Sequence, residues 1–206
     1  MKLLHINAST RQANSQSLSI ANTLIEKIKI KNPSVEIIVD TFNLFEDDLP
    51  QFNKNAVGAK MALFTGQESN SEEKRTWAKI KEVYDRFESA DIYVFNVPLW
   101  NNNIPYILKQ FIDVVTQPGW SFGFDPIKGY SGLLENKKAY LVVASGVYYE
   151  GIQSNFGSDF ATPYLNDWLN FIGVTDIKNI SVSPTVLNTN FEKTKTEVIQ
   201  SLDDIA

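Results

Sequence analysis

Four hydroxyl side chains lie in a short polar segment between the first predicted strand and the first predicted helix. They are Ser9, Thr10, Ser15 and Ser17. The N-terminus of a helix presents unpaired N–H groups and the positive end of the helix dipole, and both bind anions. The segment contains no glycine, so it matches neither a GxGxxG dinucleotide motif nor a GxxxxGK(S/T) P-loop. It therefore predicts a monophosphate site, with plain helix capping by Ser15 and Ser17 as the alternative.

A second polar loop follows the most apolar strand of the chain, Ile92 to Val97. Pro98 is expected to end that strand because proline has no N–H to donate. Leu99, Trp100 and three asparagines come next, and Pro105 then opens a helix. An apolar ring beside amide groups is what a flat heteroaromatic ligand needs. Because asparagine is common in turns, a tight turn is the alternative interpretation.

A third loop, Ser145 to Val147, follows the predicted strand at 139–144. In an open parallel sheet, ligands bind outside the carboxyl ends of the strands. All three loops follow strands, so we expect them to meet at one edge of the sheet. Together they predict a ligand site that none of them predicts alone.

Several kinds of chemistry lack the residues they need. The chain has no cysteine, which excludes thiolate nucleophiles and zinc–thiolate sites, and no acidic cluster has metal-ligand spacing. The only histidine, His5, falls inside the first strand, where a structural role is expected. Without an evident acid, base or nucleophile, a redox enzyme that uses a cofactor's chemistry becomes the natural candidate.

Composition limits the partners and the compartment. The 206 residues carry a net charge of −5, and no basic face for nucleic acid is evident. No apolar run approaches the roughly 20 residues of a membrane span. The N-terminal residues predict a strand rather than a signal peptide, so we expect a cytoplasmic protein.

The remaining pattern predicts one domain over residues 1–206, an α/β fold with a doubly wound five-stranded parallel sheet. Expected strands are 2–8, 35–39, 92–97, 139–144 and 177–182, with Asp40 ending the second. Expected helices are 16–30, 56–63, 71–89, 105–116, 162–172 and 191–204. Trp120, Phe122 and Phe124 alternate with small residues, so 117–136 predicts an exposed β-hairpin that walls a pocket.

The order of these motifs resembles the FMN-dependent NADH-azoreductase and NAD(P)H:quinone oxidoreductase family. The matching segments are Ala8-Ser9, Ser15-Gln16-Ser17, VPLWNNNIPYILKQFID, GWSFGF and ATPYLNDWLNFIGVTDI. The resemblance implies a flavodoxin-like fold with strand order 2-1-3-4-5 and a hairpin insertion. It also implies a homodimer with FMN at the subunit interface.

The same resemblance assigns roles to individual residues. The FMN-binding set is Ser9, Ser15, Gln16, Ser17, Pro98, Leu99, Trp100, Asn101, Asn102, Ser145, Gly146 and Val147. Phe124, and with it Trp120, would line the substrate side of the flavin. The family often has an aromatic residue where Asn102 stands and a second glycine where Val147 stands, so substrate preference is open.

The implied activity is ping-pong hydride transfer through FMN, from NADH to a quinone, with azo compounds reduced to amines. The physiological acceptor and the preference between NADH and NADPH stay open. Two alternatives are a flavodoxin-type electron carrier that does not oxidise NADH, and a binding domain that has lost its flavin.

Overall fold

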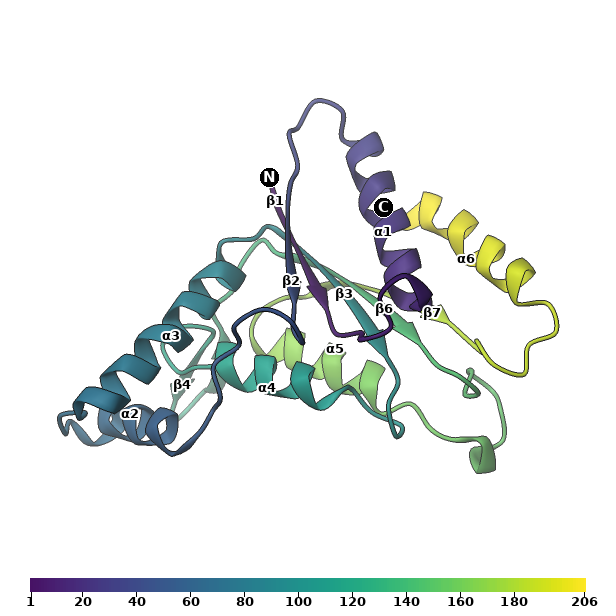
Figure 1. The fold of residues 1–206 in the computed structure, drawn as a ribbon. Helices are drawn as coiled ribbons and strands as arrows, with labels where there is room; N and C mark the ends of the chain where they lie inside the picture. The colour runs from purple at the N-terminus through teal and green to yellow at the C-terminus, as the bar shows by residue number, and fades with distance from the viewer.

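The computed structural model describes all 206 residues, and a five-stranded parallel sheet lies at its centre (Figure 1). The strand order is β2-β1-β3-β6-β7, which is the predicted 2-1-3-4-5 order once the two hairpin strands are numbered separately. The strands of the sheet are β1 (Lys2–Asn7), β2 (Ile38–Asn43), β3 (Ile92–Pro98), β6 (Lys138–Ala144) and β7 (Asp176–Val182). The apolar run that predicted a central strand is β3, in which all residues except Pro98 are buried.

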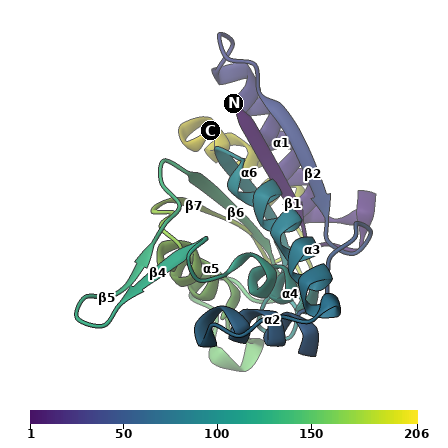
Figure 2. The ribbon, with the colours of Figure 1, turned by 90° about the vertical axis from the view of Figure 1, so that its left-hand side faces the viewer.

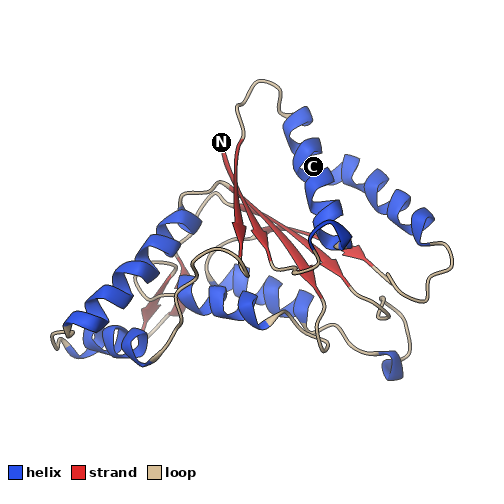
Figure 3. Cartoon of the chain, in the orientation of Figure 1, coloured by secondary structure: helices blue, strands red, loops and turns tan.

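Helices cover both faces of the sheet (Figure 3). Their bounds are α1 (Gln16–Lys31), α2 (Lys54–Thr65), α3 (Ser71–Glu88), α4 (Tyr106–Val115), α5 (Ala161–Phe171) and α6 (Phe191–Ile205). Helices α1 and α6 enclose a core of 13 buried residues on one face, and α3, α4 and α5 enclose 28 on the other. Helix α2 packs on α3. Both faces are therefore buried, as a doubly wound parallel sheet requires.

The second strand differs from its prediction. It runs from Ile38 to Asn43 rather than over 35–39, and Asp40 lies inside it, paired in register with Leu4. An acidic residue is tolerated there because β2 is an edge strand and the guanidinium of Arg86 binds the Asp40 carboxylate at 2.7 Å. Ile38, taken as part of an apolar run, is 60% exposed.

The predicted hairpin forms from β4 (Phe122–Asp125) and β5 (Gly129–Gly132), and it projects away from the sheet (Figure 2). Trp120 lies before the hairpin rather than in its alternating strand. Its ring packs against α3, with ring centroids 5.1 Å from Trp77 and 5.2 Å from Tyr84. Burial against this cluster raises the pKa of Tyr84 to about 12, and the Tyr84 hydroxyl donates to the Trp120 carbonyl at 2.7 Å.

None of the helices is both long enough and apolar enough to cross a bilayer.

Candidate functional site

The three polar loops lie together at the carboxyl edge of β1, β3 and β6. Parallel register pairs Asn7 with Asn96, and Pro98 with Ala144. Each loop therefore leaves the sheet at a similar height on neighbouring strands. The structure confirms the predicted convergence of these loops, which is the geometry of a ligand site in an open α/β sheet.

The first loop joins β1 to α1 through a short 3₁₀ turn, Gln12–Asn14. The Ser15 hydroxyl caps α1 by accepting the N–H of Leu18 at 3.2 Å, and it lies 3.2 Å from the Ser17 hydroxyl. Ser9, Ser15 and Ser17 are all buried. Gln16 and Ser17 open the helix, where N–H groups have no intrahelical acceptor. Ser15 is thus a helix cap, and the neighbouring N–H groups remain available for an anion.

Gln16 offers a test of whether this loop fits the expected FMN. Its side-chain Oε1 is buried and has no hydrogen-bond partner. A buried polar atom without a partner is costly unless something satisfies it. FMN carries hydroxyls next to its phosphate, and such a hydroxyl would supply the donor that Oε1 lacks. The loop therefore fits a phosphorylated, hydroxyl-bearing ligand.

The second loop is a tight turn and still fits a ring site. Asn101 and Asn102 have φ angles of 49° and 65°, and Trp100 and Asn103 exchange two backbone hydrogen bonds of 2.8 and 2.9 Å. Asparagine adopts this left-handed conformation at low cost, which explains the repeated asparagines. The N–H groups of Asn101 and Asn102 donate to no other protein atom. The turn therefore presents two free donors next to the Trp100 ring.

Phe45, an aromatic residue that the sequence analysis did not single out, packs against Trp100. The Phe45 ring lies 5.8 Å from the Trp100 ring and meets Tyr106 edge-on at 5.7 Å. Phe45 follows β2, so it belongs to a fourth loop at the same edge. Phe45 could have been found from its position two residues after the end of β2. Because the predicted strand ended at residue 39, this position was not recognised.

The Asn102 side chain and carbonyl also hold the chain before α5. The Asn102 carbonyl accepts the N–H of Phe160 at 2.9 Å, and its Oδ1 lies 3.4 Å from the N–H of Ser158. Where the family often has an aromatic side chain, this chain has an amide that contacts a neighbouring loop.

The third loop is held by the segment that follows β7. The Ser145 carbonyl accepts from the N–H of Thr185 at 2.9 Å, and the Gly146 carbonyl accepts from the N–H of Val186 at 2.7 Å. The N–H groups of Gly146 and Val147 have no protein acceptor. A Cβ built on Gly146 would meet only Val186, at an ordinary 3.7 Å, so packing within this chain does not demand glycine. The bare backbone suits the close approach of a flat ligand.

The structure does not bring Trp120 and Phe124 to these loops. Segment 117–136 connects the end of α4 to Lys138, which pairs with Ile92 at the opposite edge of the sheet. There Leu134 donates to the carbonyl of Ile172 at 2.9 Å. Phe124 is 64% exposed on the hairpin. The substrate-side role of both residues stays a prediction.

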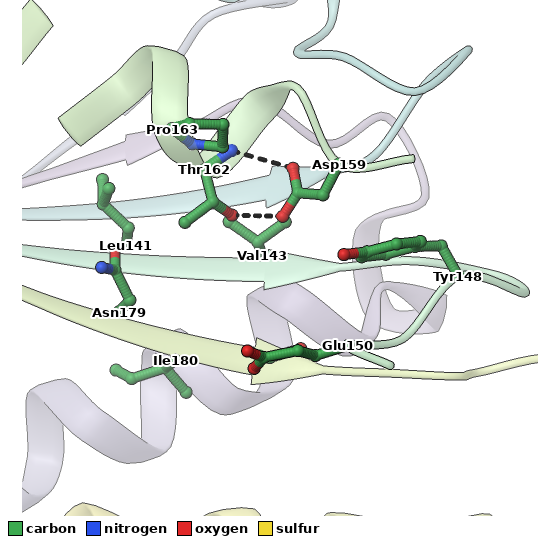
Figure 4. Close-up of a pocket in the computed structure, with 10 residues that line it drawn as sticks. Leu141, Val143, Tyr148, Glu150, Asp159, Thr162, Pro163, Asn179 and Ile180 are labelled. Carbon is green, nitrogen blue, oxygen red and sulfur yellow. Dashed lines mark hydrogen bonds between the residues drawn. The ribbon is translucent and has the colours of Figure 1, made fainter. Parts of the chain in front are cut away.

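A cavity of about 400 Å³ lies next to the third loop, between β6, β7 and α5 (Figure 4). Tyr148, Glu150 and Asp159 line its outer side. The Asp159 carboxylate accepts from the backbone N–H and the hydroxyl of Thr162, at 2.9 and 2.6 Å. None of the residues of the first two loops lines this cavity, so it adjoins the predicted flavin site without forming it.

A family model described as the flavodoxin-like fold matches residues 1–205. The FMN-dependent NADH:quinone oxidoreductase of Ruegeria pomeroyi is 42% identical over 186 residues, which cover 90% of each chain. The chain belongs to the FMN-dependent NADH:quinone oxidoreductase family. A second member, FMN-dependent NADH:quinone oxidoreductase 3 of Pseudomonas fluorescens, is 38% identical over 93% of this chain and 89% of its own.

Solved structures agree with this membership of the NADH:quinone oxidoreductase family. An FMN-dependent NADH-azoreductase from Bacillus anthracis, solved in complex with FMN, superposes with a TM-score of 0.86 at 25% identity. The match covers all of this chain and 97% of that one. A second Bacillus anthracis azoreductase reaches a TM-score of 0.88 at 23% identity, with 100% and 98% coverage, which supports the shared fold.

Proposed function

We propose that this protein is an FMN-dependent NADH:quinone oxidoreductase that also reduces azo compounds to amines, working as one flavodoxin-like domain over residues 1–206. The observation that carries the proposal is the convergence of three loops with free backbone donors at one edge of the sheet. The relatives named for this activity match 90% and 93% of this chain, so the similarity that supports the proposal extends over nearly its whole length.

Each loop would hold a different part of FMN. The N-terminus of α1, with Ser9, Ser15 and Ser17, would bind the phosphate through N–H groups and hydroxyls. Trp100, with Pro98 and Leu99 before it, would line the ring, and the free N–H groups of Asn101 and Asn102 would fix its orientation.

The third loop would meet the polar edge of the ring. The N–H groups of Gly146 and Val147, with Ser145 beside them, would stabilise negative charge that develops there during reduction. Bound FMN supplies the hydride and two-electron chemistry, and the protein supplies binding, orientation and electrostatics. No side chain is assigned as a nucleophile, an acid or a base.

We also infer that two copies pair and that the hairpin of one completes the site of the other. Within one chain the hairpin lies at the wrong edge of the sheet to reach the loops. Its side chains Phe124, Ile127 and Tyr130 are 64%, 95% and 63% exposed, an apolar surface that a partner would cover. Pairing would place Phe124 on the substrate side of the flavin, as the resemblance implies. Because NADH is a cytoplasmic metabolite, we place the enzyme in the cytoplasm.

The first experiment is a visible spectrum of the purified protein, followed by anaerobic addition of NADH and then of a quinone. We expect flavin bands that bleach with NADH and return with the quinone. A flavin-bearing protein that NADH does not bleach would overturn the reductase assignment in favour of an electron carrier. A colourless protein that FMN does not reconstitute would overturn flavin binding itself.

A further inference from the structure

A row of four polar side chains crosses three strands directly below the first loop. His5 Nε2 lies 2.7 Å from Asn96 Oδ1, Asn96 Nδ2 lies 2.8 Å from Asn7 Oδ1, and Asn7 Nδ2 lies 2.9 Å from Asn43 Oδ1. The backbone N–H of Ser9 also donates to Asn7 Oδ1, at 3.0 Å. We name these four side chains the amide ladder. It connects the interior of the sheet to the loop expected to bind phosphate.

One backbone group sets the direction of every bond in the ladder. The Ser9 N–H can only donate, so the Asn7 atom that faces it must be the acceptor Oδ1. Asn96 must then present its NH₂ group to that oxygen, which turns its own Oδ1 toward His5. His5 Nε2 must therefore carry a proton and donate. On the other side, the Asn7 NH₂ group faces Asn43.

The buried part of the ladder has no alternative partner. His5 is 3% exposed and Asn96 is fully buried, so water cannot replace a lost bond. Burial lowers the pKa of His5, which the bond to Asn96 partly opposes, so the ring is neutral at pH 7. Strand alternation puts His5 and Asn7 on the same face as Leu3, which packs in the core with α1. The ladder therefore lies on the side of the sheet that carries α1.

We propose that three side chains of the amide ladder form a positioning device for FMN: His5 orients Asn96, Asn96 orients Asn7, and Asn7 fixes the Ser9 N–H and the phosphate loop. Asn43, which only accepts from the other side of Asn7, is not part of this device. This inference rests on the proposed function, because it assigns the loop to the FMN phosphate. The ladder acts on the phosphate end of the ligand only. Its loss should therefore weaken FMN far more than riboflavin, which has the same ring and no phosphate.

Flavin titrations of the apoprotein test this assignment. We expect Asn7→Ala and Asn96→Leu to weaken FMN binding by about tenfold, the scale of one lost buried hydrogen bond, and riboflavin binding by less than about twofold. Asn43→Ala is the matched control, because it removes the far partner and leaves both acceptor bonds of Asn7 Oδ1 in place. Equal losses for FMN and riboflavin would show a merely structural role and overturn the proposal.

A pair of substitutions at His5 tests the same proposal if the asparagine variants do not fold. His5→Gln retains a donor near the position of Nε2, whereas His5→Leu does not, so the first should preserve the FMN preference and the second should lower it. If a folded His5→Leu protein kept the wild-type preference for FMN over riboflavin, the positioning role proposed for the ladder would be overturned. Wild-type protein that binds neither flavin would instead refute the proposed function.

The direction of the ladder has its own readout. The chain has a single histidine, so a ¹⁵N NMR spectrum of the ring contains signals from His5 alone. We expect the neutral tautomer with the proton on Nε2. A proton on Nδ1 at neutral pH would contradict the donor role of His5 Nε2 and the orientation assigned to Asn96.

Discussion

Ser15 shows how one side chain can serve both the fold and the site. Its hydroxyl caps α1 through the N–H of Leu18, and it stands among the groups proposed to hold phosphate. We predict that Ser15→Ala lowers the free energy of unfolding by about 1 kcal/mol through the lost cap. We also predict that it weakens FMN binding by about tenfold. Chemical denaturation of the apoprotein and FMN titration measure the two effects separately.

Asn70 provides the control for that prediction. Its side chain caps α3 by accepting the N–H of Glu73 at 3.0 Å, within a complete capping box. Asn70→Ala should cost a similar amount of stability and leave FMN affinity unchanged. If both variants lost the same FMN affinity, the effect of Ser15 on binding would be no more than lost stability.

The two central asparagines of the second loop show a residue type matched to backbone shape. Both Asn101 and Asn102 have positive φ, which the side chain of asparagine tolerates better than most. Sequence alone left a turn and a ring site as alternatives for this loop. The geometry shows that they are compatible, since the turn itself leaves two N–H groups free.

At the scale of elements, an ion pair between Asp40 and Arg86 connects the edge strand β2 to helix α3. Arg86 donates to both oxygens of Asp40, at 2.7 and 3.0 Å, and its guanidinium stacks over the Phe42 ring at 4.2 Å. These hydrogen bonds hold the pKa of Asp40 below its ordinary value of 3.8. A carboxyl whose pKa is lower in the folded state stabilises the fold above its unfolded pKa. That stability is lost as the pH falls through the folded pKa.

We therefore predict that the wild-type protein loses more stability than Asp40→Asn when the pH falls from neutral to below 3.8. At neutral pH the variant should be the less stable of the two, because it no longer has the charged pair. Urea denaturation of both proteins at several pH values measures the difference. Parallel stability curves throughout this range would contradict the assignment.

Most elements could be predicted from the spacing of their apolar residues, and the edge strand β7 is among them, whereas the other edge strand, β2, was misplaced. Helices α1 and α5 have buried faces that repeat with the helical period, strand β3 is a continuous apolar run, and the structure confirms all three. Strand β2 was displaced by several residues because it buries little and its charge is satisfied by a residue 46 positions away. Trp120 seemed to continue the hairpin pattern, yet its partners lie on α3, which no local pattern reveals.

The candidate site divides in the same way. The loops were predictable because each directly follows a strand with a clear apolar signal. The amide ladder was not, because it depends on register: Asn7 and Asn96 are neighbours only once β1 and β3 are paired. His5 was predicted to lie within a packed strand, and it is buried in β1, but its bond to Asn96 could be found only in the structure.

For the whole molecule, the main question is how the hairpin could reach the three loops that are proposed to bind FMN. The loops proposed to bind flavin lie at the carboxyl edge of the sheet, and the hairpin segment connects to β6 at the opposite edge. The proposed second copy, with its hairpin over the loops of the first, would resolve this separation. In such a dimer the exposed rings of Phe124 and Tyr130 would form part of a shared pocket instead of an exposed apolar surface.

The residue Ile127 at the hairpin tip tests that arrangement, because it is 95% exposed in the single chain. We predict that Ile127→Asp raises the dimer dissociation constant by about tenfold or more, by placing a charge in an apolar interface. NADH-dependent quinone reduction should fall with the dimer fraction and recover at high protein concentration.

Ile30→Asp is the control, since Ile30 is 74% exposed near the end of α1, away from the hairpin. Sedimentation and activity measured over one dilution series decide the matter. If Ile127→Asp gives active monomers, each chain completes its own site and the hairpin has another use.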